Sequence, residues 1–131
     1  TGHSAGGHLA LLCAGRRLPG AYVGVVALAP VADLAEAFRL DLDSGAVREL
    51  LGGEPDQVPD RYDQADPCRL PAPPVPVVVV HGTDDATVPA ELSRRYSTQS
   101  AAQLRLLDGI GHFELIDPRS AAWPVALRSP A

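Results

Sequence analysis

The chain of 131 residues carries a formal net charge of −5 and is 46% hydrophobic and 21% charged, the composition of one ordinary soluble globular domain. Folding at this length buries roughly two-thirds of the extended chain's surface, enough for a hydrophobic core, which disfavours disorder and a collagen-like repeat. The longest apolar run, residues 77–80, is far shorter than the ~20 residues of a membrane-spanning helix, and the acidic balance disfavours nucleic acid as a partner because neutralising phosphates requires a basic surface.

The first part of the chain predicts one helix and one buried strand. Apolar residues recur at helical spacing over 5–16, and Gly15 with the turn after it ends this helix. The run from Tyr22 to Leu28 is almost continuously apolar, which is typical of a strand covered on both faces. Residues 30–74 have the least regular pattern, and within them we expect short helices over 34–40 and 46–51.

The rest of the chain predicts two more strands and two more helices. In chain order these elements are a strand over 75–81, a helix over 89–102, a strand over 103–107 and a helix over 118–127. Pro89 suits the first turn of its helix, whereas Pro124 kinks or shortens the last one. This alternation implies parallel strands joined by right-handed crossovers, so the predicted fold class is α/β, a parallel sheet with flanking helices.

The chain begins with a motif that bears on chemistry. Residues 2–6 fit the pattern G-x-S-x-G, in which the chain turns sharply from a strand into a helix. We expect a side chain at either flanking glycine to collide with the neighbouring backbone. The turn strains Ser4 and lifts its hydroxyl above the sheet edge, beside the backbone N–H of Ala5 at the positive end of the helix dipole. Ordinary turns of small residues also fit this pattern, so the motif needs partners.

A serine hydroxyl requires a general base and a third group that orients the base. The strand at 75–81 leads into a loop that contains Asp84 and Asp85, and the strand at 103–107 leads into a glycine-rich loop that contains His112. Both loops follow the carboxyl ends of parallel strands, where α/β sheets place ligands. Serine, then aspartate, then histidine is the chain order of α/β hydrolases.

The chain resembles the C-terminal half of the α/β-hydrolase superfamily over nearly its whole length, in the three segments GHSAGGHLA, HGTDDATVP and GIGHFELIDP. The sequences of these segments are most similar to those of the esterase, kynurenine-formamidase-like and prolyl-oligopeptidase-like groups. The resemblance implies that Ser4 is the nucleophile, Asp85 the acid and His112 the base, with the Ala5 N–H in the oxyanion hole and with no cofactor and no metal.

The activity that this resemblance implies is hydrolysis of carboxylic esters by a serine hydrolase that acts on a small-molecule acyl substrate. A kynurenine-formamidase-like amide hydrolase and a prolyl-oligopeptidase-like serine peptidase are the enzymatic alternatives. A catalytically silent binding module of the same fold is the alternative from a different class, although all three candidate residues are present.

Three further histidines compete with His112 for the role of base. We expect His3 to point away from the nucleophile across the turn and His8 to lie one helical turn beyond Ser4. For His81 we expect a hydrogen bond to the turn that follows it. Metal ligation by these histidines is disfavoured because no H-E-x-x-H or C-x-x-C spacing is present.

Asp84 and Asp33 are the alternatives to Asp85 as the acid. Because successive side chains alternate in direction, Asp84 and Asp85 cannot both face His112, and the family spacing favours Asp85. Asp84 is then a turn residue that bonds its own backbone. Asp117 is expected to cap the helix that begins after it.

The two cysteines, Cys13 and Cys68, are too few for a disulfide scaffold, and we expect both to be buried thiols. The motif around Ser4 normally lies in the middle of a fold, and the chain lacks methionine. We therefore expect residues 1–131 to be a partial α/β-hydrolase domain without its N-terminal half, which is poorly soluble or inactive when produced alone.

Residues 33–74 fit either a small cap over Ser4 or a plain crossover with proline-rich packing. We expect a cytoplasmic location, with any export signal lying upstream of Thr1. The sequence leaves the oligomeric state open.

Overall fold

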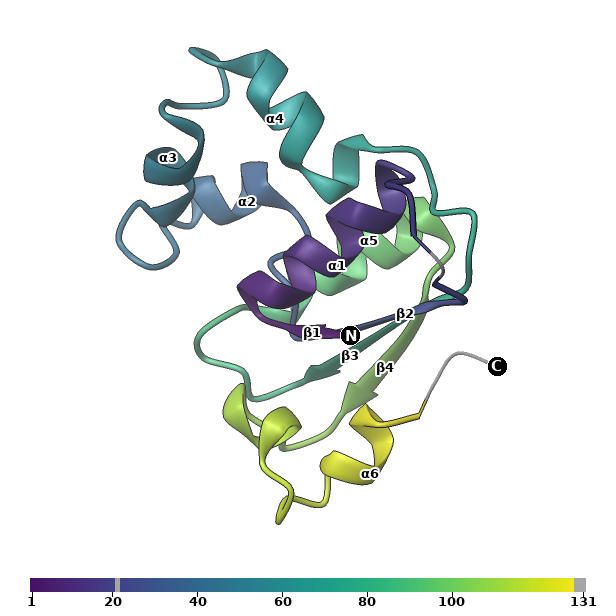
Figure 1. The fold of residues 1–131 in the computed structure, drawn as a ribbon. Coiled ribbons are helices and arrows are strands. Elements are labelled where there is room, and N and C mark those ends of the chain that lie inside the picture. Colours follow the sequence, from purple (N-terminus) through teal and green to yellow (C-terminus); the bar gives the residue numbers. More distant parts are fainter. Residues whose placement is uncertain (21, 129–131) are drawn as a thin grey trace.

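A four-stranded parallel sheet organises the molecule (Figure 1). The computed structural model describes residues 1–20 and 22–128. The strands lie in chain order across the sheet and are β1 Gly2–His3, β2 Val25–Leu28, β3 Val77–Gly82 and β4 Gln103–Leu107. Each neighbouring pair is parallel. The predicted α/β class with a parallel sheet is therefore confirmed.

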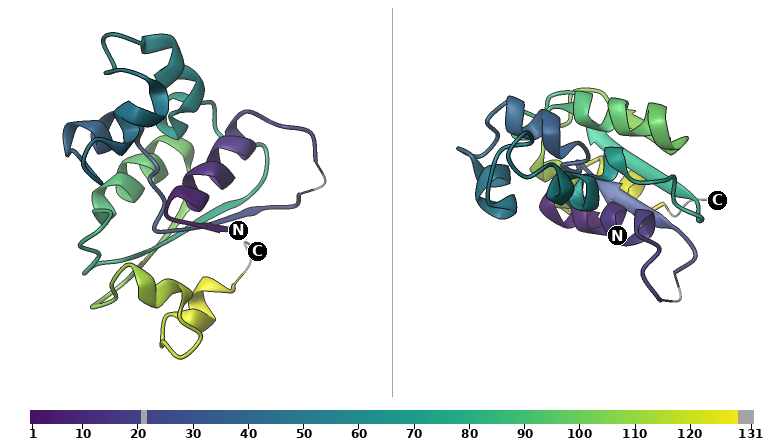
Figure 2. Two further views of the ribbon diagram at one scale, coloured as in Figure 1. Left: turned by 60° about the vertical axis from the view of Figure 1, so that its left-hand side comes forward. Right: turned by 90° about the horizontal axis from the view of Figure 1, so that it is seen from above.

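Helices cover both faces of the sheet, as Figures 1 and 2 show. Helix α1 (Ala5–Gly15) and helix α5 (Ala90–Ser100) pack on one face, where Leu11 and Tyr96 meet Val79. The short helices η2 (Phe113–Ile116) and α6 (Trp123–Ala126) pack on the other face. Because every residue of β2 and β3 is buried, an unbroken apolar run is what these strands require.

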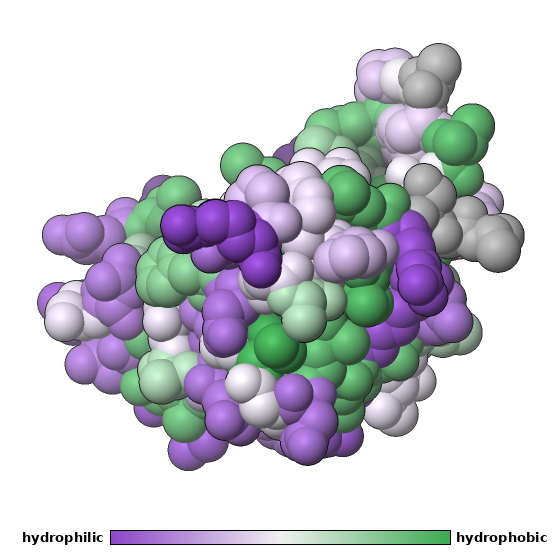
Figure 3. All heavy atoms as spheres, turned by 90° about the horizontal axis from the view of Figure 1, so that it is seen from below, coloured by the Kyte–Doolittle hydropathy of each residue, from purple (hydrophilic) through white to green (hydrophobic). Residues whose placement is uncertain are grey.

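The face that carries η2 and α6 exposes apolar side chains among polar ones. Figure 3 shows this mixture from below, with hydrophobic residues in green and hydrophilic residues in purple. Phe113 is 67% exposed and Leu127 is 60% exposed.

Between β2 and β3 the chain forms a group of short helices at one end of the molecule (Figure 1). These are α2 Leu34–Arg39, α3 Ala46–Leu51, α4 Pro59–Ala65 and η1 Pro67–Arg69. Their apolar residues form a core of their own with Val88 and Leu92, separate from the two faces of the sheet. The buried ring of Tyr62 lies within this core. The helices predicted over 34–40 and 46–51 are confirmed, and α4 and η1 are additional elements.

Two buried carboxylates tie this group of helices together. Asp33 caps α2 by accepting the Glu36 N–H at 2.9 Å and also accepts Arg95 Nε at 2.6 Å. Asp66 accepts the backbone N–H groups of Ala35 and Cys68, each at 3.1 Å. These bonds satisfy donors that a helix start would otherwise leave unpaired.

Several expected boundaries are wrong. The buried strand begins at Val25 rather than Tyr22, and a fourth strand, β1, leads into Ser4. The last helix spans only Trp123–Ala126, because Pro124 fits only in the first turn of a helix and so prevents one from running through it. Asp117 accordingly caps a turn, in which its carboxylate accepts the Arg119 N–H at 2.9 Å.

Cys13 is exposed rather than buried, and Cys68 is half-buried. Within residues 1–20 and 22–128, none of the helices has the length and hydrophobicity needed to cross a membrane.

The turn between β1 and α1 holds Ser4 in a strained conformation. Its φ of 55° and ψ of −118° are unusual for a residue with a side chain, at a cost of about 1–3 kcal/mol. The turn is fixed from both sides, since Ser4 N donates to the Leu28 oxygen at 2.9 Å and the Ser4 oxygen accepts His8 N at 3.0 Å.

The glycines of the motif are not equally required. A Cβ on Gly2 would overlap the carbonyl oxygen of Gly6, and a Cβ on Gly7 would lie 2.9 Å from Pro30 Cβ. A Cβ on Gly6 would meet nothing within 4 Å. The expected collision at both glycines flanking Ser4 is therefore wrong for Gly6, and the close approach is instead made at Gly7.

This difference predicts opposite effects for two matched substitutions. Gly2→Ala should lower the free energy of unfolding by about 1–3 kcal/mol, because the turn must shift to admit a methyl group. Gly6→Ala should leave it unchanged or raise it by up to about 1 kcal/mol, because alanine is the better helix former. Chemical denaturation of both variants of the natural full-length protein measures this, and equal stability of the two would contradict it.

Candidate active site

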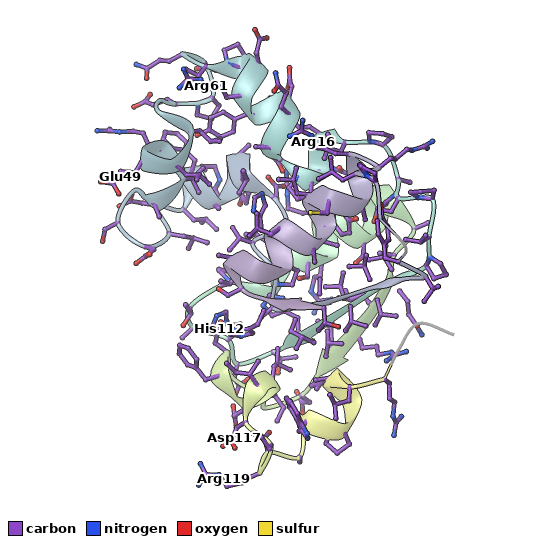
Figure 4. All side chains as sticks on the ribbon, in the orientation of Figure 1. Arg16, Glu49, Arg61, His112, Asp117 and Arg119 are labelled. Atoms are coloured by element: carbon purple, nitrogen blue, oxygen red, sulfur yellow. The ribbon has the colours of Figure 1, made fainter. Side chains whose placement is uncertain are left out.

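Three loops at the carboxyl ends of parallel strands bring the predicted site residues to one region. Ser4 lies in the turn after β1, Asp85 in the loop after β3 and His112 in the loop after β4. Figure 4 shows His112 in its loop beside the start of α1. Asp85 Oδ2 lies 2.6 Å from His112 Nδ1, and both residues are buried, with 9% and 5% of their surfaces exposed.

Asp85 is held as a carboxylate by its own loop. Its Oδ1 accepts the backbone N–H groups of Thr87 at 2.9 Å and Val88 at 2.8 Å. Burial raises the pKa of Asp85, but these bonds and the one from His112 outweigh burial, and its pKa lies below the ordinary value. Asp85 is therefore ionised at neutral pH.

The bond to Asp85 also sets the state of the His112 ring. An ionised carboxylate only accepts, so Nδ1 must carry the proton that it donates. In the neutral ring Nε2 then has a free lone pair, which is the arrangement that a general base requires.

Asp84 does not form the turn as expected. Its side chain is exposed, and its Oδ1 accepts the Thr83 hydroxyl at 3.2 Å. The backbone hydrogen bonds that shape this turn go to Asp85 instead. Asp33, the other alternative, is engaged as the cap of α2 and as the partner of Arg95.

His3, expected only to point away from Ser4, contacts the His112 loop. Its Nε2 donates to the His112 carbonyl oxygen at 2.9 Å, and the two ring centroids are 4.4 Å apart. Burial lowers the pKa of His3, which keeps the ring neutral beside His112. In the described residues no hydrogen bond joins the Ser4 hydroxyl to His112, so His3 is the observed link between the two loops. Bonds between a serine and its base are often long before substrate binds.

The other two histidines make structural bonds. His81 Nε2 donates to the Val88 oxygen at 2.8 Å, as expected for the turn after it. His8 Nε2 donates to the Ala65 oxygen at 2.8 Å, which joins α1 to the end of α4.

Asp33, Asp66 and Cys68 lie close enough together to suggest a metal site, because their potential ligand atoms are all within 4.8 Å of one another. The carboxylates of both aspartates are already occupied by backbone N–H groups and by Arg95. Burial raises the pKa values of Asp66 and of the Cys68 thiol, which opposes the charged forms that bind cations. This group therefore does not fit a metal ion, and we interpret it as the capping cluster described above.

A cavity of about 480 Å³ opens onto Ser4. Its wall is mostly aliphatic, with polar atoms contributed by Ser4, His8, Asp43 and Thr87. The aliphatic side chains come from α2, α3 and their flanking loops and from the Asp85 loop, and they are Val31, Leu34, Leu42, Val47, Leu50 and Val88. The helices inserted between β2 and β3 thus line a space beside the candidate nucleophile.

Ala5 is the expected donor to an oxyanion. Ala5 is the first residue of α1 and also lines the cavity. The first N–H groups of a helix have no acceptor within the helix, and they can donate to an anion.

Solved structures resemble this fold. A puromycin hydrolase is 27% identical with a TM-score of 0.64, over 85% of this chain and 18% of that chain. A thermophilic esterase from the planctomycete Thermogutta terrifontis is 26% identical with a TM-score of 0.65, over 96% of this chain and 50% of that one. An acetyl ester-xyloside bifunctional hydrolase from Caldicellulosiruptor lactoaceticus shares the fold at 23% identity and a TM-score of 0.73, over 95% of this chain and 51% of that one.

The chain thus spans from about a fifth to about half the length of these proteins. No curated protein sequence matches it significantly. Residues 1–119 match the sequence profile of the prolyl oligopeptidase family. This match includes the turn at Ser4 and the loops of Asp85 and His112, and the parallel sheet is that of its structural neighbours. The chain therefore belongs to the prolyl oligopeptidase family of the α/β-hydrolase superfamily.

Proposed function

We propose that this chain carries the catalytic residues of a serine hydrolase that cleaves carboxylic esters of small acyl substrates. The observation that carries the proposal is the 2.6 Å hydrogen bond between the buried side chains of Asp85 and His112. The backbone of His112 also accepts a hydrogen bond from His3, the residue that precedes the strained Ser4. Membership of the prolyl oligopeptidase family supports the reaction class.

In the proposed mechanism, Ser4 Oγ attacks the acyl carbonyl while His112 Nε2 takes its proton. Asp85 keeps the imidazole in the required tautomer and stabilises the imidazolium. The Ala5 N–H donates to the developing oxyanion. His112 then protonates the leaving alcohol and activates the water that hydrolyses the acyl-enzyme.

Support for an ester substrate comes from the cavity beside Ser4 and from one structural neighbour. An aliphatic wall favours an acyl chain, because burying each methylene contributes about 0.8 kcal/mol. The neighbour from Thermogutta terrifontis is an esterase at 26% identity.

A peptidase or amide hydrolase is the second candidate. Family membership and the 27% identical puromycin hydrolase favour it as strongly as the neighbours favour an esterase. A panel of p-nitrophenyl esters, N-formylkynurenine and a proline-containing dipeptide amide distinguishes these candidates by their kcat/KM values. Labelling at Ser4 by a fluorophosphonate separates all of them from a silent binding module, which would not react.

Replacing the proposed nucleophile should abolish turnover. In the natural full-length protein, Ser4→Ala should lower kcat for p-nitrophenyl acetate by about 10⁶-fold, the scale of losing a triad nucleophile. The matched variant Ser120→Ala, in a turn before α6, should retain activity. Turnover of Ser4→Ala within tenfold of the wild type would show that the assignment is wrong.

Filling the cavity should shorten the preferred acyl chain. Ala46 lines the cavity at the start of α3, so Ala46→Leu adds three carbon atoms there. The ratio of kcat/KM for the p-nitrophenyl octanoate to that for the acetate should fall by about tenfold, the cost of displacing one to two methylenes. Ala121→Leu, at an exposed position, is the control. An unchanged ratio in Ala46→Leu would show that the cavity takes no part in recognising the acyl chain.

A further inference from the structure

We propose that His81, with Ser93 behind it, is a positioning residue that fixes Asp85 and through it the ring of His112. This inference rests on the proposed function. A chain of contacts carries it: Ser93 Oγ lies 2.7 Å from His81 Nδ1, and His81 Nε2 lies 2.8 Å from the Val88 oxygen and 3.2 Å from Asp85 Oδ2. Asp85 Oδ2 in turn accepts His112 Nδ1 at 2.6 Å.

The hydrogen-bond partners determine the tautomer of His81. The Val88 carbonyl and the Asp85 carboxylate only accept, so Nε2 must carry a proton. Nδ1 of the neutral ring is then an acceptor, and the Ser93 hydroxyl must donate to it. Ser93 thus holds the N–H of His81 toward the Asp85 loop.

Burial keeps this arrangement neutral and ordered. His81 and Ser93 both have 0% of their surfaces exposed. Burial lowers the pKa of His81, so its ring stays uncharged at neutral pH. The preceding residues of β3 are all valines, and a polar ring buried at the end of such a strand is costly unless both nitrogens are bonded. His81 therefore marks a specific requirement of this strand end.

His81 contacts both the loop of Asp85 and its carboxylate, and so fixes one relative to the other. Val88 donates its N–H to Asp85 Oδ1 and accepts from His81 through its oxygen. The His81 N–H also lies beside Oδ2, the atom that His112 uses. Four donor groups thus surround one carboxylate, and they fix the plane in which it faces the His112 ring.

The protonation of His112 depends on the groups around it, above all on Asp85 Oδ2. His81 from β3 shares Asp85 Oδ2 with it, and His3 from β1 stacks near its ring. On η2 the Glu114 carboxylate accepts the Gly111 N–H, close to the His112 backbone. When a hydrogen-bond donor to Asp85 is removed, the carboxylate becomes more basic and attracts the imidazolium of His112 more strongly. Loss of the donor should therefore move the acidic limb of the kcat/KM profile to higher pH.

The test uses serines on one helix. Ser93→Ala removes the hydroxyl behind His81, whereas Ser97→Ala removes a hydroxyl four residues along α5 that has no hydrogen-bond partner in the described structure. Ser93→Thr retains a hydroxyl and serves as the conservative rescue. His81→Phe removes the whole ring at similar size.

Hydrolysis of p-nitrophenyl acetate by the natural full-length protein is measured from pH 5 to 9 and divided by active sites counted with a fluorophosphonate. We expect Ser93→Ala and His81→Phe to lower kcat per active site by about 10- to 100-fold, by analogy with the loss of a hydrogen-bond partner that orients a metal-binding histidine. Their acidic limbs should move to higher pH while KM stays within about threefold, and Ser93→Thr and Ser97→Ala should match the wild type.

Two outcomes overturn the inference in different ways. If Ser93→Ala retains the wild-type profile and the wild-type kcat per labelled site, His81 acts only in packing, even where His81→Phe fails to fold. If the wild-type protein neither reacts with the fluorophosphonate nor turns over the ester, the proposed function fails, and the positioning role fails with it.

Discussion

The buried carboxylate of Asp85 is the constraint on which the arrangement of this site depends. It accepts two backbone N–H groups from its own loop and the Nδ1–H of His112 from the next loop, and His81 at the end of β3 lies against it. A buried charge is tolerated only when its lone pairs are occupied by donors. The loops after β3 and β4 must therefore stay together, and the position of His112 follows from that requirement.

The sheet provides the rigid frame for this constraint. β3 pairs with β2 and β4 on either side and is buried along its length, so the residues that follow the strands start from fixed points. The β1–α1 turn uses the same frame, since the Ser4 N–H donates to the end of β2. His3 then connects this turn to the His112 backbone. The strain at Ser4 is maintained because bonds on both sides of the residue oppose its relaxation.

The helices between β2 and β3 contribute a different property, the wall of a cavity. Their apolar residues pack into a core that includes Val88 of the Asp85 loop. The same residue thus joins the wall of the cavity to the loop that holds the carboxylate. A change in these helices is expected to alter which acyl group fits beside Ser4, whereas a change in the Asp85 contacts is expected to alter the reactivity of His112. Because the two sets of contacts meet at one residue, the two properties are not fully independent.

The strand pattern and the three motifs could be interpreted locally. A run of valines identifies a strand buried on both faces, and strands that alternate with helices imply parallel pairing, which places the ends of β1, β3 and β4 at one edge. Helix α4 was missed because only Tyr62 of its seven residues is buried, so it has no apolar periodicity. The contact of His3 with His112 joins residues 109 positions apart, and the bond of His81 to Ser93 depends on how α5 packs on β3. Such contacts leave no local pattern, because they arise only when separate elements pack, and for that reason only the folded chain determines them.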